Sequence, residues 1–173
     1  MAQIIGKQLS ETDEKIIHEL VERGFGQKIN DKPGQLLLSK IEALYLLNKK
    51  KIEVKKGKTN LTFEMLLKLW EKNEKELSEL LQIYTDLRSK NYIVRTGYNQ
   101  ESEAYFRVYE KGMRPGESHS TWLVKLIDEK ELIKIKKISK EINIAHSLRK
   151  KILWAIIDPK DQITYYKLEK MSL

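Results

Sequence analysis

The hydrophobic pattern changes its period near residue 91, and this change limits what the chain can fold into. Before that point apolar residues recur at helical spacing, most clearly over 71–90, in the stripe Leu77, Leu80, Leu81, Tyr84 and Leu87. After it apolar and polar residues alternate, as in half-buried strands, in NYIVRTG, EAYFRVY and STWLVKLI. The sequence therefore predicts a mainly helical domain over 1–84 and a strand-rich domain over 85–173.

Weaker signals place further elements in each domain. In the first we expect a strand over 3–8, a helix over 11–23 capped by Ser10, a helix through LLLSKIEALYLLNKK, a strand and turn in KIEVKKGK, and a helix beginning at Thr62. In the second we expect a helix over 129–140, then strands at ILWAIID and QITYYKL. The predicted fold class is α+β or α/β, with a small helical-plus-sheet domain followed by a mixed-sheet domain.

Composition excludes several classes of protein. The chain has no cysteine, which excludes disulfides, zinc fingers and thiol catalysis. Its three histidines stand in neither an HxxxH nor an HxH arrangement, which argues against a transition-metal site. No apolar run approaches the ~18–20 residues of a membrane span. The start, MAQIIGKQLSETDEK, lacks the layout of a signal peptide, so we expect a cytoplasmic protein without a membrane partner.

The net charge of +8, from 33 Lys and Arg against 25 Asp and Glu, favours a polyanionic partner. Nucleic acid and an anionic membrane surface both fit. A composition rich in Lys and Glu is also typical of proteins from hot environments, and composition alone does not separate these explanations. The basic residues concentrate in 129–151, EKELIKIKKISKEINIAHSLRKK, next to the loop YEKGMRPGESHS.

Three side chains are candidates for chemistry. Tyr109 ends the strand EAYFRVY on the same face as Arg107, His119 lies at the exit of the loop YEKGMRPGESHS, and Lys150 precedes the strand ILWAIID. Each alone also fits an ordinary strand tyrosine, a solvated loop histidine or a member of a basic cluster. Together they supply a base, an acid and a fixed cation, the groups required when a ribose 2′-hydroxyl attacks its own phosphate. The sequence does not show that the three segments meet.

Segments of the C-terminal half resemble the archaeal tRNA-splicing endonuclease family, in the family's order and spacing. They are YTDLRSKNYIVRTG at 84–97, YFRVYEKG at 105–112, GESHSTWLVKL at 116–126, AHSLRKKILWAIID at 145–158 and QITYY at 162–166. In the first half, LLLSKIEALYLL resembles a helix of the same family. The resemblance implies an N-terminal α+β domain over 1–84 that serves assembly, and a restriction-endonuclease-like catalytic nuclease domain over 85–173.

The resemblance also implies roles for the three candidates. Tyr109 would be the general base towards the 2′-hydroxyl, His119 would protonate the leaving 5′-oxygen, and Lys150 would stabilise the pentacoordinate phosphate. The products would be a 2′,3′-cyclic phosphate and a 5′-hydroxyl, formed without a metal or other cofactor. An ordinary tyrosine, with a pKa of about 10, is a poor base at pH 7. We therefore expect the cations Lys150 and Arg107 to stabilise the tyrosinate.

The implied substrate is precursor tRNA folded as a bulge–helix–bulge, which is recognised by its shape. Candidate RNA contacts lie in the 134–140 stretch and at Arg107, Arg114, Arg149 and Lys151. The implied assembly is a tetramer, either of this chain alone or with a separate structural subunit. Its expected interface residues are Asp158 and Asp161, in a loop that docks on a partner, and Tyr165, in a last strand that pairs across a dimer.

The sequence departs from the family at Asn143, where many relatives carry an arginine that clamps a bulge base, and in the loop 98–104. One alternative is a non-catalytic structural or RNA-binding subunit of the same complex, but the complete set of three candidates favours a catalytic chain. Another is a DNA nuclease that holds magnesium through a P-D…(D/E)-x-K pattern. ILWAIIDPK offers only Asp158, outside that pattern.

Overall fold

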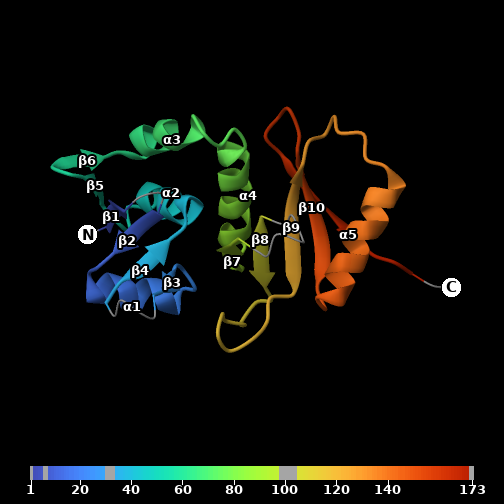
Figure 1. Cartoon of the computed structure of the whole chain (residues 1–173), viewed down its shortest axis with the longest axis horizontal. Helices are drawn as coiled ribbons and strands as arrows, with labels where there is room; N and C mark the ends of the chain where they lie inside the picture. Colours follow the sequence, from blue (N-terminus) through green and yellow to red (C-terminus); the bar gives the residue numbers. More distant parts are fainter. Residues whose placement is uncertain (1, 6–7, 30–33, 98–104, 172–173) are drawn as a thin grey trace. The chain divides into compact units, whose positions relative to one another are not determined.

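The computed structural model describes residues 2–5, 8–29, 34–97 and 105–171 (Figure 1). The chain forms two compact units, Met1–Thr85 and Asp86–Leu173. Helix α4 (Leu77–Ser89) contributes residues to both. Within the described ranges, no helix has both the length and the apolar character needed to cross a membrane.

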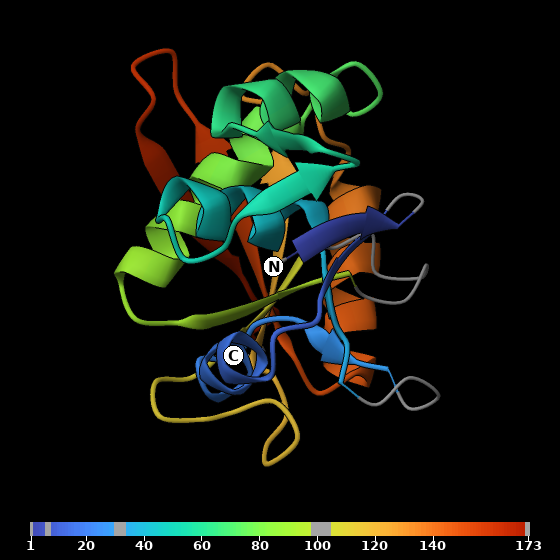
Figure 2. The same cartoon turned by 90° about the vertical axis from the view of Figure 1, so that its left-hand side faces the viewer.

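The first unit is built on a sheet with the strand order β3-β4-β2-β1-β5-β6. The described strands are β1 (Ala2–Ile5), β2 (Gln8–Glu11), β3 (Gln27–Lys28), β4 (Leu36–Leu38), β5 (Val54–Lys56) and β6 (Thr59–Leu61). All neighbours are antiparallel except β1 and β5, which are parallel. Three further helices complete the unit, α1 (Glu14–Glu22), α2 (Lys40–Asn48) and α3 (Phe63–Glu71). Figures 1 and 2 show α1 and α3 at opposite ends of the unit, with α2 between them.

Two expected helix starts in this unit are wrong. Ser10 lies inside β2, and Asp13 caps α1 by accepting from the backbone N–H groups of Lys15 at 3.0 Å and Ile16 at 3.2 Å. The first three leucines of LLLSKIEALYLLNKK form β4, because a capping box between Ser39 and Glu42 starts the helix after them. The predicted start at Thr62 is confirmed, since its side chain accepts from the Met65 N–H at 3.3 Å.

The predicted apolar stripe of α4 is confirmed as a buried face. Its members are Leu77, Leu80, Leu81, Tyr84 and Leu87, all at most 9% exposed. In the first unit, Tyr84 meets Tyr45 edge-to-face at 5.4 Å between ring centroids, and Tyr45 stacks on Phe25 at 5.9 Å. Aromatic burial of this kind ties α4 to α2.

The second unit holds a mixed sheet with the order β11-β10-β9-β8-β7. Its described strands are β7 (Ile93–Thr96), β8 (Phe106–Tyr109), β9 (Trp122–Ile127), β10 (Lys151–Ile157) and β11 (Ile163–Leu168). β9 and β10 are parallel, and the other neighbouring pairs are antiparallel. A helix, α5 (Ile135–Ser147), connects the two parallel strands and lies against β10 (Figure 1). The expected mixture of helices and sheets is thus confirmed in both units.

Helix α5 starts later and ends later than the expected 129–140. Asp128 holds a turn before it, with its carboxylate accepting from the Lys130 N–H at 2.9 Å and its carbonyl from the Glu131 N–H at 3.0 Å. The helix then continues through Ala145 and His146, in a segment expected to be non-helical. Its apolar face packs on a core of Leu123, Ile127, Ala145, Ile152 and Trp154.

A buried ion pair also joins α5 to the sheet. The Glu141 carboxylate accepts from Lys125 Nζ of β9 at 2.8 Å and from Trp154 Nε1 of β10 at 2.9 Å. All three residues are at most 8% exposed, so the Glu141 carboxylate compensates for the burial of both the Lys125 charge and the Trp154 N–H.

Candidate active site

The sheet of the second unit brings the end of β8 and the starts of β9 and β10 together. Trp122 of β9 is the register partner of both Val108 in β8 and Lys151 in β10. The Thr121 N–H donates to the Val108 carbonyl and the Lys151 N–H to the Thr121 carbonyl, each at 2.9 Å. Figure 1 shows the loop before β9 and the turn after α5 at this same end of the sheet. The segments that carry the three candidate side chains therefore converge here.

Tyr109 is the last residue of β8 and only 6% exposed. It is paired with Ile93 of β7. Because side chains alternate along a strand, Tyr109 shares a face with Arg107, while Phe106 and Val108 point to the other face. The alternation therefore places a phenol and a guanidinium on one side of this strand.

His119 follows a loop shaped by glycines in left-handed conformations. Gly112 has φ +86° and Gly116 has φ +92°, values that side chains rarely allow. The Arg114 carbonyl closes the second turn by accepting from the Ser118 N–H at 3.0 Å and from Ser118 Oγ at 3.1 Å. His119 itself is exposed, and Ser120 beside it is buried. The loop thus presents the imidazole to solvent, while the buried Ser120 next to it fixes the backbone.

Lys150 lies in the tight turn between α5 and β10. Its N–H donates to the Ala145 carbonyl at 2.8 Å, and Arg149 before it has φ +53°. Its ammonium donates to the Ser120 carbonyl, which places it next to the His119 backbone. Burial lowers the pKa of Lys150, and the positive charge of Arg107 lowers this pKa further. The ammonium is therefore held close enough to Arg107 to feel its charge.

Three other expected RNA contacts lie around this end of the sheet: Arg114, Arg149 and Lys151. The 134–140 stretch forms the start of α5, away from it. Arg114 and Arg149 are exposed. Lys151 is exposed too, with its ammonium 5.0 Å from the ring centroid of Trp122. The Trp122 Nε1–H donates to Glu110 at 3.1 Å, so an oriented indole ring lies under the Lys151 side chain.

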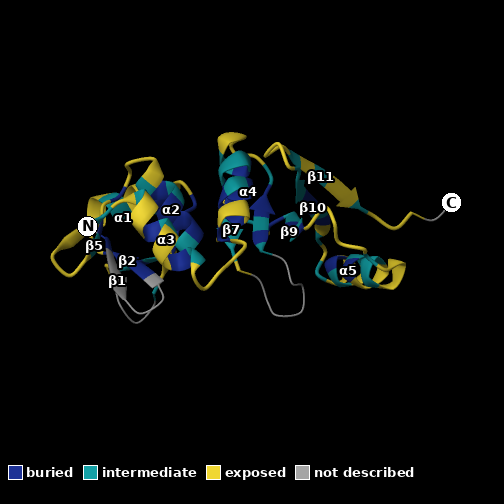
Figure 3. Ribbon diagram, turned by 90° about the horizontal axis from the view of Figure 1, so that it is seen from above, coloured by how far each residue is buried: buried dark blue, intermediate teal, exposed yellow. Residues whose placement is uncertain are grey.

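The three expected interface residues have different surroundings within the second unit. Asp158 Oδ1 accepts from the N–H groups of Lys160 at 2.8 Å and Gln162 at 2.9 Å, which closes the turn between β10 and β11. Asp161 is exposed. Tyr165 donates its hydroxyl to Asp86 at 2.8 Å, and burial and this carboxylate raise its pKa. Figure 3 shows β11 exposed over much of its length.

Several site features have no clear signal in the sequence. The Ser120 carbonyl is a backbone acceptor, which any residue would supply. The Glu141 network and the side chains around Asn143 depend on the continuation of α5 beyond residue 140, where the sequence predicts its end. The continued helix places Glu141 and Ala145 on one face. The loop 98–104 lies outside the described residues. Within the described ranges, no group of three or more His, Asp or Glu residues is placed to hold a metal ion.

Comparisons with known proteins account for both units. Residues 77–165 match the family model of the tRNA intron endonuclease catalytic C-terminal domain, and residues 2–67 match that of its N-terminal domain. The chain belongs to the tRNA intron endonuclease family. The catalytic-domain match spans Tyr109, His119 and Lys150, so the end of the sheet described above lies within the family's catalytic domain, and the chain is an endonuclease.

Individual relatives agree over most of their length. The tRNA-splicing endonuclease of Thermococcus gammatolerans is 36% identical over 165 residues, covering 95% of this chain and 94% of the relative. That of Methanothermobacter thermautotrophicus is 36% identical over 145 residues, covering 84% and 81%. That of Methanococcus maripaludis is 36% identical over 139 residues, covering 80% and 77%. The family assignment therefore extends to both domains.

Proposed function

We propose that this endonuclease cleaves precursor tRNA at bulge–helix–bulge splice sites by transesterification, with Tyr109, His119 and Lys150 as its catalytic residues. The observation that carries the proposal is the convergence of three segments, from β8, the loop before β9 and the turn before β10, at one end of one sheet. Tyr109 and Lys150 flank the start of β9, and the Lys150 ammonium contacts the residue after His119.

In this reaction the phosphorus atom exchanges one oxygen for another. Tyr109 takes the proton of the 2′-hydroxyl, whose oxygen forms a bond to phosphorus. The bond between phosphorus and the 5′-oxygen breaks, and His119 gives that oxygen a proton. The Lys150 ammonium stabilises the negative charge that builds up on the non-bridging oxygens. The products are a 2′,3′-cyclic phosphate and a 5′-hydroxyl, and both protons are accounted for by side chains of this chain.

The charge of the chain supports an RNA substrate read by its shape. The half-buried Arg107 and the exposed Arg114, Arg149 and Lys151 surround the converging segments, and the net charge is +8. Exposed cations such as the last three bind phosphates without reading sequence. The proposal includes assembly into a tetramer, of this chain alone or with a structural subunit. Asp161 and the exposed edge strand β11 are its proposed contacts, and the cytoplasm is its proposed location.

The experiment compares two RNAs in the presence of EDTA. One is a precursor tRNA with its bulge–helix–bulge, and the other has the same strand lengths with the bulges closed by base pairs. We expect cleavage of the first at both bulges and none of the second. Equal cleavage of both would contradict recognition of the bulges.

A chain that binds the first RNA without cutting it would favour the structural-subunit alternative. The control variant for this outcome is His119→Ala, which removes the proposed acid from an exposed loop position. If the chain is catalytic, this variant binds the bulged RNA as wild type does but cuts it at least about a hundredfold more slowly.

A further inference from the structure

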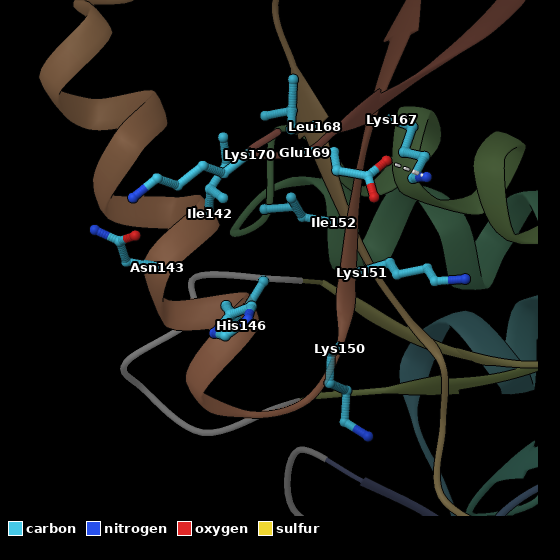
Figure 4. A pocket seen from close by; sticks show the side chains of 11 residues that line it. Ile142, Asn143, His146, Lys150, Lys151, Ile152, Lys167, Leu168, Glu169 and Lys170 are labelled. Atoms are coloured by element: carbon cyan, nitrogen blue, oxygen red, sulfur yellow. Dashed lines mark ion pairs between the residues drawn. The ribbon is translucent and has the colours of Figure 1, made fainter. Parts of the chain in front are cut away.

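A pocket of about 480 Å³ lies between the second half of α5, the start of β10 and the end of β11 (Figure 4). Its lining includes Asn143 and His146 from α5, Lys150 at the start of β10, and Lys170 just after β11. The pocket therefore adjoins the side chain that we propose to stabilise the scissile phosphate. Nothing in the proposed cleavage step uses its other residues.

The pocket has an apolar floor and a polar rim. The floor consists of side chains that pack in the core of the second unit: Ile142, Ala145, Ile152 and Leu168. In Figure 4, Asn143, His146 and Lys170 lie on the α5 side of this floor. All three are exposed, so their donor groups reach solvent.

A carboxylate also lines the pocket but does not oppose an anion on the α5 side. Glu169 is ion-paired with Lys167, and Figure 4 shows this pair on the side away from α5. The hydrogen bond from Lys167, together with the charges of Lys167 and Lys151, lowers the pKa of Glu169, so this carboxylate stays ionised and paired with Lys167. The α5 side therefore presents an ammonium, an imidazole and an amide.

These groups are the donors that proteins use to hold phosphate oxygens. Lysine contributes charge, while asparagine and histidine contribute directed hydrogen bonds. An apolar floor suits the carbon face of a ribose rather than a second charged group. The backbone bond from the Lys150 N–H to the Ala145 carbonyl, at 2.8 Å, ties the last turn of α5 directly to Lys150.

We infer that this pocket binds a phosphodiester, with its ribose, of the RNA strand next to the scissile phosphate. Lys170, His146 and Asn143 contact the phosphate. The inference rests on the proposed function, because it assigns the pocket to the same RNA. It predicts that affinity depends on one particular phosphate beside the cleavage position.

The test replaces phosphates near the cleavage position one at a time with neutral methylphosphonates. Each carries a 2′-deoxy sugar on its 5′ side, so that the linkage cannot cut itself, and an RNA with the same deoxy sugar is its control. A deoxy sugar at the cleavage nucleotide prevents turnover. Fluorescence anisotropy then gives the Kd for the wild-type chain, for the double variant Lys170→Gln/His146→Gln, and for Lys72→Gln. Lys72 is an exposed lysine of the first unit and serves as the charge-matched control.

For wild type we expect a loss of about five- to twentyfold at one flanking phosphate. The double variant should bind unmodified RNA about that much more weakly and should be insensitive to substitution at that phosphate, since the contact is already lost. The Lys72→Gln chain should behave as wild type. A double variant that binds as wild type, or that loses as much as wild type at every substituted phosphate, would overturn the inference.

Two further outcomes separate this inference from others. If inorganic phosphate weakens RNA binding by wild type more than chloride does at equal ionic strength, and the double variant lacks this effect, then phosphate and the RNA compete for the pocket, which supports the inference. If the wild-type chain neither binds nor cuts the unmodified RNA, the proposed function falls first and the inference with it. Normal cleavage with an unchanged double variant overturns the pocket assignment alone.

Discussion

The surroundings of Lys150 favour its neutral form over its charged form. It is partly buried, its ammonium donates to the Ser120 carbonyl, and Arg107 lies close enough to lower its pKa. A lysine that stabilises negative charge must be protonated. A lowered pKa therefore reduces the highest pH at which Lys150 can stabilise the phosphate.

The first prediction concerns the alkaline limb of the pH–rate profile. The rate of a single turnover should fall as pH rises through the pKa of Lys150, because the ammonium is lost. An ordinary lysine has a pKa of about 10.4. Since burial and Arg107 lower the pKa of Lys150, the fall in rate should occur at a lower pH than that. Removing the charge in Arg107→Gln raises the pKa and should move the fall to higher pH.

Two control variants make this result specific. Lys150→Arg keeps a cation that does not titrate in this range, so its profile should lose the alkaline fall. Arg114→Gln removes a charge from the exposed loop and should leave the fall in place. If the alkaline fall in rate of Arg107→Gln occurs at the same pH as in wild type, or at a lower pH, the assignment of this fall to Lys150 is contradicted.

At the scale of elements, α5 and the loop before β9 hold the candidate site. α5 is tied to β9 and β10 by the pair between Lys125 and Glu141 and by the Trp154 indole. The loop holds His119 through turns at Gly112 and Gly116. Buried side-chain contacts hold α5, whereas backbone conformation holds the loop. Substitutions in α5 should therefore change mainly stability, and those in the loop should also change the position of His119.

The second prediction tests the buried pair. Glu141→Ala removes the carboxylate that accepts from the buried Lys125 ammonium, and should lower the free energy of unfolding by about 3–5 kcal/mol. The double variant Lys125→Met/Glu141→Gln removes the charge and keeps an acceptor for Trp154, so it should recover most of this loss. The matched control is Glu131→Ala, which breaks an exposed pair with Lys137 and should cost less than about 1 kcal/mol. Urea unfolding measures all three, and equal losses in both alanine variants would contradict the account.

The third prediction concerns Gly116. An added Cβ would meet no atom within 4 Å, so Gly116→Ala changes only the backbone preference at φ +92°. We expect a loss of about 1–2 kcal/mol in stability and a single-turnover rate about ten- to a hundredfold lower, because the loop relaxes and displaces His119. Gly57→Ala, at φ +62° between β5 and β6 and equally open, should lose stability without losing rate. Equal rates in the two variants would show that loop geometry does not position His119.

The elements differ in how far the sequence predicts them, for physical reasons. The strands of the second unit follow from alternation, and α3 follows from its cap at Thr62, because both signals are local. Ser10 and the leucines of β4 mislead because tertiary pairing decides their state: β2 pairs with both β1 and β4. Lys150 meets Ser120 only through the parallel register of β9 and β10, which no local pattern encodes.

At the scale of the whole molecule, the chain contains both domains of the family. Residues 2–67 match the family's N-terminal domain, and residues 77–165 match its catalytic domain. All three candidate catalytic residues come from the second unit. The central claim is therefore that this one unit supplies the base, the acid and the cation for attack by the 2′-hydroxyl of the substrate itself.

The most direct measurement is the chemical nature of the product ends, with EDTA present, for an RNA with a normal ribose at the cleavage nucleotide and for one with a single 2′-deoxyribose there. The account predicts a 2′,3′-cyclic phosphate and a 5′-hydroxyl from the first, and no cleavage at that position of the second. A 3′-hydroxyl with a 5′-phosphate, or cleavage of the deoxy RNA, would contradict it, because the attacking oxygen would then come from outside the ribose.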